Sequence, residues 1–199
     1  MKFYKTISVI LHPIVIPTIG VILYFLLIPN YLNSKQKLIL LSLIFTITYV
    51  IPLFVLILFK KLKLIKSFNV NSIKERKVPI AIMIVLFYLL GNTLFRVTPL
   101  DDLGLLFYAT CGALVFIYLL FAFSLKTSIH LASMGITTGF FLIIGAKYNH
   151  SFPIIVIASI LLSGILANAR LHLKAHTTTE VYLGYFIGFL SPFITFYFL

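Results

Sequence analysis

Long apolar runs recur along the chain, and short polar stretches separate them. Seven runs stand out, at residues 7–29, 38–59, 78–95, 103–125, 127–146, 152–169 and 181–199. An α-helix rises about 1.5 Å per residue, so a run of about 20 residues can cross the roughly 30 Å hydrocarbon core of a bilayer. The pattern predicts an all-α protein, a polytopic integral membrane bundle of about six or seven transmembrane helices.

Composition agrees with this pattern and indicates one domain. Hydrophobic residues make up 61% of the 199 residues, and the mean hydropathy is +1.14. The longest mainly polar stretch, residues 60–77, is too short to bury a core of its own, so we expect a single transmembrane domain over residues 1–199. The first run is longer than the apolar region of a typical signal peptide and lacks its cleavage pattern, so we interpret it as a spanning segment.

The net charge of +12 is high for so apolar a chain. Basic residues lie at the ends of the apolar runs, which indicates anionic lipids or an anionic substrate as partners and makes nucleic acid an unexpected one. Since Lys and Arg mark the cytoplasmic side, the charges predict a cytoplasmic basic face and a C-terminus outside. Seven crossings place twelve of the sixteen Lys and Arg residues on that face: Lys2, Lys5, Lys60, Lys61, Lys63, Lys66, Lys74, Arg76, Lys77, Lys126, Arg170 and Lys174.

Three polar clusters share this basic face: residues 72–79 (SIKERKVP), 126–132 (KTSIHLA) and 169–180 (ARLHLKAHTTTE). Ionisable groups at membrane depth are costly enough to indicate function. Lys and Arg hold anionic oxygens, while a histidine can make and break bonds to phosphorus. The combination of cations, histidines and one carboxylate is therefore typical of a phosphate site.

The spacing within the third cluster resembles a known signature. Arg170, five residues, His176, three residues and Glu180 are similar to the third signature of the type 2 phosphatidic acid phosphatase superfamily, Ser-Arg-x5-His-x3-Asp. Residues 128–130 (SIH) resemble the Ser-Gly-His of its second signature. The resemblance extends over a phosphatase-like core at about residues 72–188.

Several positions depart from the family pattern. Ala169 replaces Ser, Glu180 replaces Asp, and Ile129 replaces a glycine that would let backbone N–H groups approach the phosphate. The first signature, Lys-x6-Arg-Pro, is resembled only loosely by Lys74, Arg76 and Pro79.

The resemblance implies phosphoryl transfer without a metal or another cofactor. His176 attacks phosphorus and becomes a phosphohistidine, Glu180 orients its ring, and His130 protonates the leaving oxygen. The phosphate oxygens are held by the other polar residues of the clusters: Lys74, Arg76, Lys126, Ser128 and Arg170, with Lys174 as a further cation. The expected substrate is a lipid phosphate monoester or pyrophosphate, because its headgroup can reach a site at the membrane edge.

The same residues permit two other interpretations. His172, His176 and Glu180 follow at i, i+4 and i+8, so on one helix they share a face and can ligate a metal, as in a His/Glu metalloenzyme. Because the signatures are irregular, the chain can also be an inactive relative that binds or moves anionic lipids. The resemblance implies a bacterial inner membrane protein whose site faces the periplasm, opposite to the charge count. His12 and His150 are interpreted as membrane-interface residues.

Two glycine pairs follow the second and third clusters, at residues 135–139 (GITTG) and 184–188 (GYFIG). Small residues four apart let transmembrane helices approach closely. We therefore expect the helices that carry these two clusters to pack tightly against their neighbours.

Overall fold

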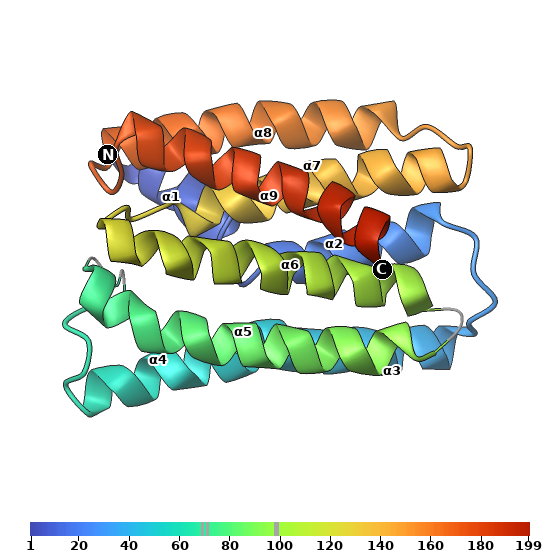
Figure 1. The fold of residues 1–199 in the computed structure, drawn as a ribbon, viewed down its shortest axis with the longest axis horizontal. Coiled ribbons are helices and arrows are strands. Elements are labelled where there is room, and N and C mark those ends of the chain that lie inside the picture. Colours follow the sequence, from blue (N-terminus) through green and yellow to red (C-terminus); the bar gives the residue numbers. More distant parts are fainter. Residues whose placement is uncertain (69, 71, 98–99) are drawn as a thin grey trace.

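The computed structural model describes residues 1–68, 70, 72–97 and 100–199. Residues 69 and 71 of the basic 60–77 stretch, and residues 98–99 of the predicted 96–102 loop, lie outside the described residues. Figure 1 shows helices lying side by side, with the two termini toward opposite ends of the bundle. The elements are α1 (Lys2–Ile10), α2 (Ile16–Leu27), α3 (Ser34–Phe45), the π-helix η1 (Thr46–Val50), α4 (Ile51–Lys61), α5 (Ile73–Phe95), α6 (Asp101–Leu120), the 3-10 turn η3 (Phe121–Phe123), α7 (Ile129–Lys147), α8 (Pro153–His172) and α9 (Thr178–Phe198).

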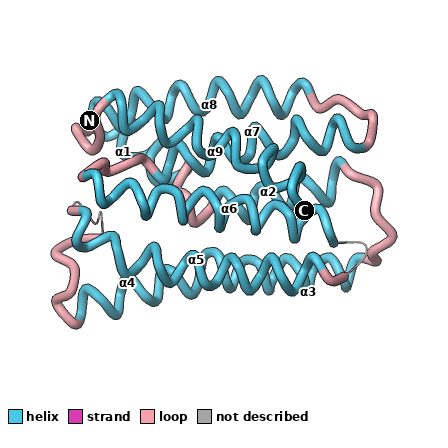
Figure 2. Tube along the Cα trace, in the orientation of Figure 1, coloured by secondary structure: helices cyan, strands magenta, loops and turns pink. Residues whose placement is uncertain are grey.

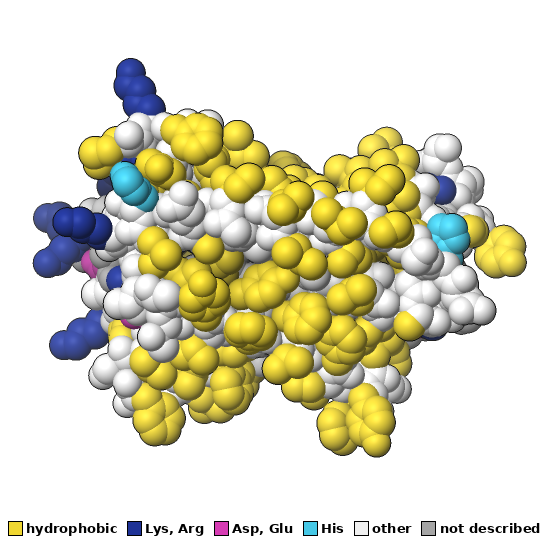
Figure 3. Space-filling view, turned by 90° about the horizontal axis from the view of Figure 1, so that it is seen from above, with side chains coloured by type: hydrophobic (Ala, Val, Ile, Leu, Met, Phe, Trp, Pro, Cys, Tyr) yellow, Lys and Arg dark blue, Asp and Glu magenta, His cyan; other side chains and the backbone are white. Residues whose placement is uncertain are grey.

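Within the described ranges, six helical stretches are long and apolar enough to cross a membrane: Ser34–Lys61, Ile73–Phe95, Asp101–Phe123, Ile129–Lys147, Pro153–His172 and Thr178–Phe198. They overlap the second to seventh apolar runs. The loops that join them lie at the two ends of the bundle (Figure 2). Hydrophobic side chains cover the middle of the molecule, whereas Lys and Arg gather at one end (Figure 3). The chain is therefore an all-helical integral membrane protein, as its sequence predicts.

The first apolar run differs from the expected single helix. It is divided into α1 and α2 by the turn at residues 11–15. Pro13 lacks a backbone N–H and disfavours helical geometry at His12, while Pro17 lies in the first turn of α2, where proline is tolerated. The 12 residues of α2 rise only about 18 Å, too short to span alone. Together α1 and α2 run from one end of the bundle to the other (Figure 1).

The chain direction gives the bundle a basic end, defined by the N-terminus, the loop between α4 and α5, the loop between α6 and α7, and the turn between α8 and α9. All three polar clusters of the sequence lie there. The opposite end holds a separate network around buried Asp102. Its carboxylate accepts hydrogen bonds from the hydroxyls of Tyr24 (3.1 Å) and Tyr148 (2.6 Å) and pairs with Lys147 (2.6 Å), which ties α2, α6 and α7 together.

Helices α7 and α9 pack through the predicted glycine pairs. A Cβ at Gly135 or Gly139 would overlap backbone atoms of α9, and one at Gly188 would overlap the carbonyl of Ala132 on α7. A Cβ at Gly184 would meet the carbonyl of Ser128 in the same way. The expectation of close packing is confirmed, and its consequence is that the first turns of α7 and α9 lie together at the basic end.

Candidate functional site

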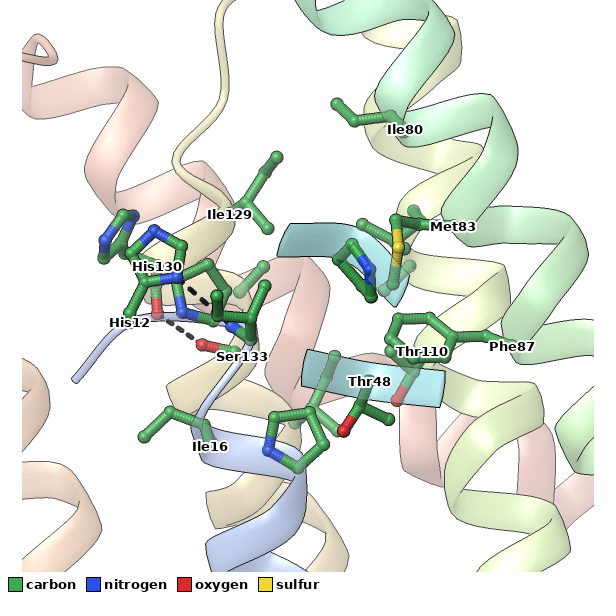
Figure 4. Close-up of a pocket in the computed structure, with 18 of the residues that line it drawn as sticks. His12, Ile16, Thr48, Ile80, Met83, Phe87, Thr110, Ile129, His130 and Ser133 are labelled. Carbon is green, nitrogen blue, oxygen red and sulfur yellow. Dashed lines mark hydrogen bonds between the residues drawn. The ribbon is translucent and has the colours of Figure 1, made fainter. Parts of the chain in front are cut away.

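Polar side chains from several helices meet around a cavity at the basic end. The cavity has a volume of about 200 Å³. In Figure 4, His12 and His130 lie together on one wall, and Met83, Phe87 and Thr110 lie across from them. Five basic side chains contribute to the lining: His12, Arg76, His130, Arg170 and His176. The structure thus brings together residues from all three predicted clusters.

Arg76 lies in the first two turns of α5 and is buried, with 7% of its surface exposed. Its Nε donates to the carbonyl of Val70 at 2.8 Å, and its Nη1 donates to the carbonyl of Thr127 at 3.4 Å. These acceptors are neutral, and no carboxylate among the described residues forms a salt bridge with Arg76. A buried cation without an ion-pair partner can balance the charge of an anion in the cavity.

Arg170 lies in the last turn of α8. Its Nη1 donates to Oγ of Ser8 at 2.7 Å, and its buried Nε has no hydrogen-bond partner among the described atoms. Buried donors are normally paired, so an unpaired one at a cavity indicates a position where a ligand or water can accept. Arg76 and Arg170 together form a pair of positive charges suited to phosphate oxygens.

His176 occupies the turn between α8 and α9 and is buried, with 8% exposed. Its Nδ1 lies 2.9 Å from the carbonyl oxygen of Lys126 and 3.0 Å from Oε2 of Glu180. Both partners are acceptors, so Nδ1 carries the proton and Nε2 is the free, nucleophilic nitrogen. The arrangement is that of a histidine oriented by a carboxylate.

The charge state of His176 follows from its surroundings. Its pKa is lowered from 6.5 to about 4, mainly by burial and then by the charges of Arg76 and Arg170, against the opposing effect of Glu180. The imidazole is therefore neutral at pH 7 and keeps its lone pair. Burial, followed by the charge of Arg76, also lowers the pKa of Lys126 in the loop before α7.

The N-terminus of α7 adds a backbone element to the site. Ser128 is its N-cap residue, yet the Ser128 side chain makes no capping hydrogen bond. Oγ of Ser128 and Oγ1 of Thr127 are buried and without partners among the described atoms. In contrast, capping boxes close the first turns of α5 and α9. An uncapped helix N-terminus offers N–H groups and a positive dipole end to an anion.

Ile129, which the sequence resemblance pairs with a glycine, is the first residue of α7. Its φ is not positive, so no glycine-specific conformation is needed at this position. The side chain of Ile129 lines the cavity, and the backbone N–H groups of the first turn of α7 lie at the basic end with it.

The N-terminal segment supplies residues that sequence reasoning missed. Ser8 on α1 contacts Arg170, and its carbonyl oxygen accepts a hydrogen bond from Nε2 of His130 at 3.2 Å. His12 was expected at the membrane interface, but it lines the cavity with its ring 4.9 Å from that of His130. One signal in the sequence could have identified Ser8 and His12: both are polar residues in an apolar run that also contains proline.

Six predicted or alternative site residues do not themselves line the cavity: Lys74, Lys126, Ser128, His172, Lys174 and Glu180, of which Lys126 and Glu180 contact His176. Lys74 and Lys174 are exposed. His172 is exposed and its ring stacks on Tyr4 at 4.2 Å, so it does not join His176 and Glu180. Among the described residues, no three His, Cys, Asp or Glu side chains are grouped as a metal site.

The cavity continues away from the basic side chains as an apolar space. Its walls come from α2, α4, α5, α6 and α7, with Thr48 of the π-helix among them. Figure 4 shows Ile16, Met83 and Phe87 around this part. The apolar lining includes Ile16, Pro17, Pro52, Val55, Leu56, Met83, Phe87, Leu114, Ile136 and Phe140. A polar end joined to an apolar interior is the shape expected for an amphiphilic ligand.

Comparisons with protein-family models, with curated proteins and with solved structures found no match to this chain.

Proposed function

We propose that this protein is a membrane-embedded phosphatase that hydrolyses a lipid phosphate monoester or pyrophosphate through a phosphohistidine. One observation carries the proposal: a neutral histidine, His176, is backed by Glu180 beside two buried or half-buried arginines that form no salt bridge in the described structure. A neutral nucleophile, its orienting carboxylate and unpaired cations are the parts that phosphoryl transfer through a histidine needs. The order of the three signatures and the spacing of the third support the same reaction.

The proposed chemistry has two steps. First, Nε2 of His176 forms a bond to phosphorus while the bond from phosphorus to the leaving oxygen breaks and His130, protonated on both ring nitrogens at the start, gives that oxygen the proton of its Nδ1. The proton on Nδ1 remains hydrogen-bonded to Glu180, which stabilises the charge on the ring. In the second step water attacks phosphorus, His130 takes its proton, and the N–P bond breaks to restore His176. Arg76 and Arg170 balance the charge on the phosphoryl oxygens in both steps.

The apolar part of the cavity supports a lipid rather than a water-soluble substrate. A headgroup between Arg76 and Arg170 leaves its tail beside apolar walls and close to the bilayer. The proposed location is a bacterial inner membrane. The basic residues at the site end favour a cytoplasmic site, whereas the family resemblance favours a periplasmic one.

The proposal is tested by phosphate release from purified protein in detergent. We expect release from a lipid phosphate monoester or a polyprenyl pyrophosphate, and slower release from glycerol phosphate, which lacks an apolar tail. Activity should survive EDTA and be blocked by vanadate, which imitates the pentacoordinate phosphoryl state. Loss in EDTA that zinc or manganese restores would favour the metalloenzyme instead. Phosphate binding without release would identify an inactive relative.

The pH dependence of the reaction should reflect the unusual state of His176. Because its pKa is about 4, the ring stays neutral as the pH falls through 6.5 and gains a proton only near pH 4. The acid limb of kcat/KM should therefore lie near pH 4, since kcat/KM reports the free enzyme. Initial rates across this range measure it, and a limb near the ordinary histidine value would contradict the assignment.

A further inference from the structure

Ser8 lies in the N-terminal segment, outside every signature that the sequence offers. Its side chain is buried, and its Oγ accepts the 2.7 Å hydrogen bond from Nη1 of Arg170. This is the one hydrogen bond that the Arg170 guanidinium makes within the described part of the chain. The Nε of Arg170 is buried and has no partner there. The orientation of Arg170 therefore depends on a hydroxyl that lies 162 positions away in sequence.

A second contact fixes the depth of α1 beside the site. At the end of α1, Leu11 N–H bonds to the carbonyl of Ile7 and His12 N–H bonds to that of Val9. The helix ends before a residue pairs with the carbonyl of Ser8, so this oxygen is free to accept from Nε2 of His130. Because α1 ends at Ile10, the carbonyl of Ser8 has no partner in the helix and can bond to His130.

The same contact decides how His130 is protonated. A carbonyl oxygen can only accept, so Nε2 of His130 carries a proton and Nδ1 is the nitrogen left for proton transfer. The ring of His12 packs edge-on at 4.9 Å and limits rotation of the His130 ring. Helix α1 is therefore attached to two site residues through one serine.

We propose that Ser8 is a positioning residue that fixes the Arg170 guanidinium for phosphate binding. Helix α1 contributes to the site through this serine. The inference rests on the proposed function only in assigning phosphate to Arg170. A charged hydrogen bond to a buried side chain is strong enough for its loss to be measured. Since Ser8 acts through Arg170, its effect should disappear when Arg170 is absent.

The test is a double-mutant cycle on inorganic phosphate binding, measured by titration calorimetry of the full-length protein in detergent. We expect Ser8→Ala to raise the Kd by about tenfold, as for a hydrogen bond to a charged group. In an Arg170→Ala background, Ser8→Ala should change the Kd less than about twofold. Ser8→Thr keeps the hydroxyl and should restore most of the affinity. Thr6→Ala is the matched control, because Thr6 is an exposed hydroxyl residue on the same helix whose side chain donates to the carbonyl of Lys2.

Two outcomes would overturn the inference. Ser8→Ala could bind phosphate as tightly as wild type and Thr6→Ala, or it could weaken binding equally with and without Arg170. Phosphate release, followed in parallel, separates this result from the proposed function. Coupling between Ser8 and Arg170 without turnover would refute the phosphatase alone, whereas turnover with additive effects would refute the role of Ser8 alone.

Discussion

Replacing His176 by alanine should abolish phosphate release, with an expected loss of about 10⁴-fold or more, as when a covalent nucleophile is removed. The ring is the one neutral nucleophile that the structure holds between a carboxylate and two site arginines in its described part. Wild-type protein incubated with a radiolabelled lipid phosphate and quenched under denaturing alkaline conditions should carry labelled phosphohistidine. The His176→Ala protein should carry none.

His172→Ala provides the matched control for this experiment. His172 is four residues away and exposed, and it stacks on Tyr4 rather than lining the cavity. Its removal should leave phosphate release within about threefold of wild type, as expected for a surface position. If His176→Ala kept most of its activity, the nucleophile would be misassigned. If both histidines proved essential and activity required a metal, the metalloenzyme would replace the phosphatase.

Replacing Arg76 by alanine should lower kcat/KM by about 10²- to 10³-fold, the size of effect seen when a donor to transition-state charge is removed. Arg76 is buried and has no salt-bridge partner in the described structure, so its charge is available to phosphoryl oxygens. Arg76→Lys should recover only part of the activity, because a lysine cannot reproduce the forked bonds to Val70 and Thr127. Phosphate release across substrate concentrations measures both variants, and thermal unfolding of each shows whether it is folded.

Lys74→Ala is the control for charge alone. Lys74 lies two residues earlier on α5, is exposed and does not line the cavity, although its sequence position resembles that of a site residue. Its loss should change kcat/KM less than about threefold, the range expected of an exposed charge. Equal losses from Lys74→Ala and Arg76→Ala would mean that the site uses only the overall positive potential of this end.

The sequence was sufficient to predict the architecture, since burial in a bilayer imposes long apolar runs that can be read directly. Counting crossings then placed the clusters around Arg76, His130 and His176 at one end without any knowledge of packing. The glycine pairs also predicted close packing of the helices that carry them, because a missing side chain has a direct steric consequence, but that these two helices pack against each other came from the structure.

The details of the site depend on tertiary contacts that leave little trace in a linear pattern. Residues 74 and 76 are about 200° apart around a helix, so only the packing of α5 decides that Arg76 enters the cavity and Lys74 does not. Pro13 in the sequence indicates a break after α1, but it does not indicate which contact the break allows. The helix ends so that the carbonyl of Ser8 meets His130, and this pairing joins residues 122 positions apart.

Glu180 has two roles, one toward His176 and one in its own helix. The same oxygen, Oε2, accepts from Nδ1 of His176 at 3.0 Å and from the backbone N–H of Thr177 at 3.1 Å, which closes the first turn of α9. Glutamate three residues after the N-cap has the reach that such a capping box requires. When this turn frays, His176 loses its carboxylate acceptor at the same moment as the helix loses its cap, and the carbonyl of Lys126 is the acceptor that remains. Local unfolding of a single helical turn would therefore be enough to release the proposed nucleophile from its carboxylate reversibly while the rest of the bundle stays folded.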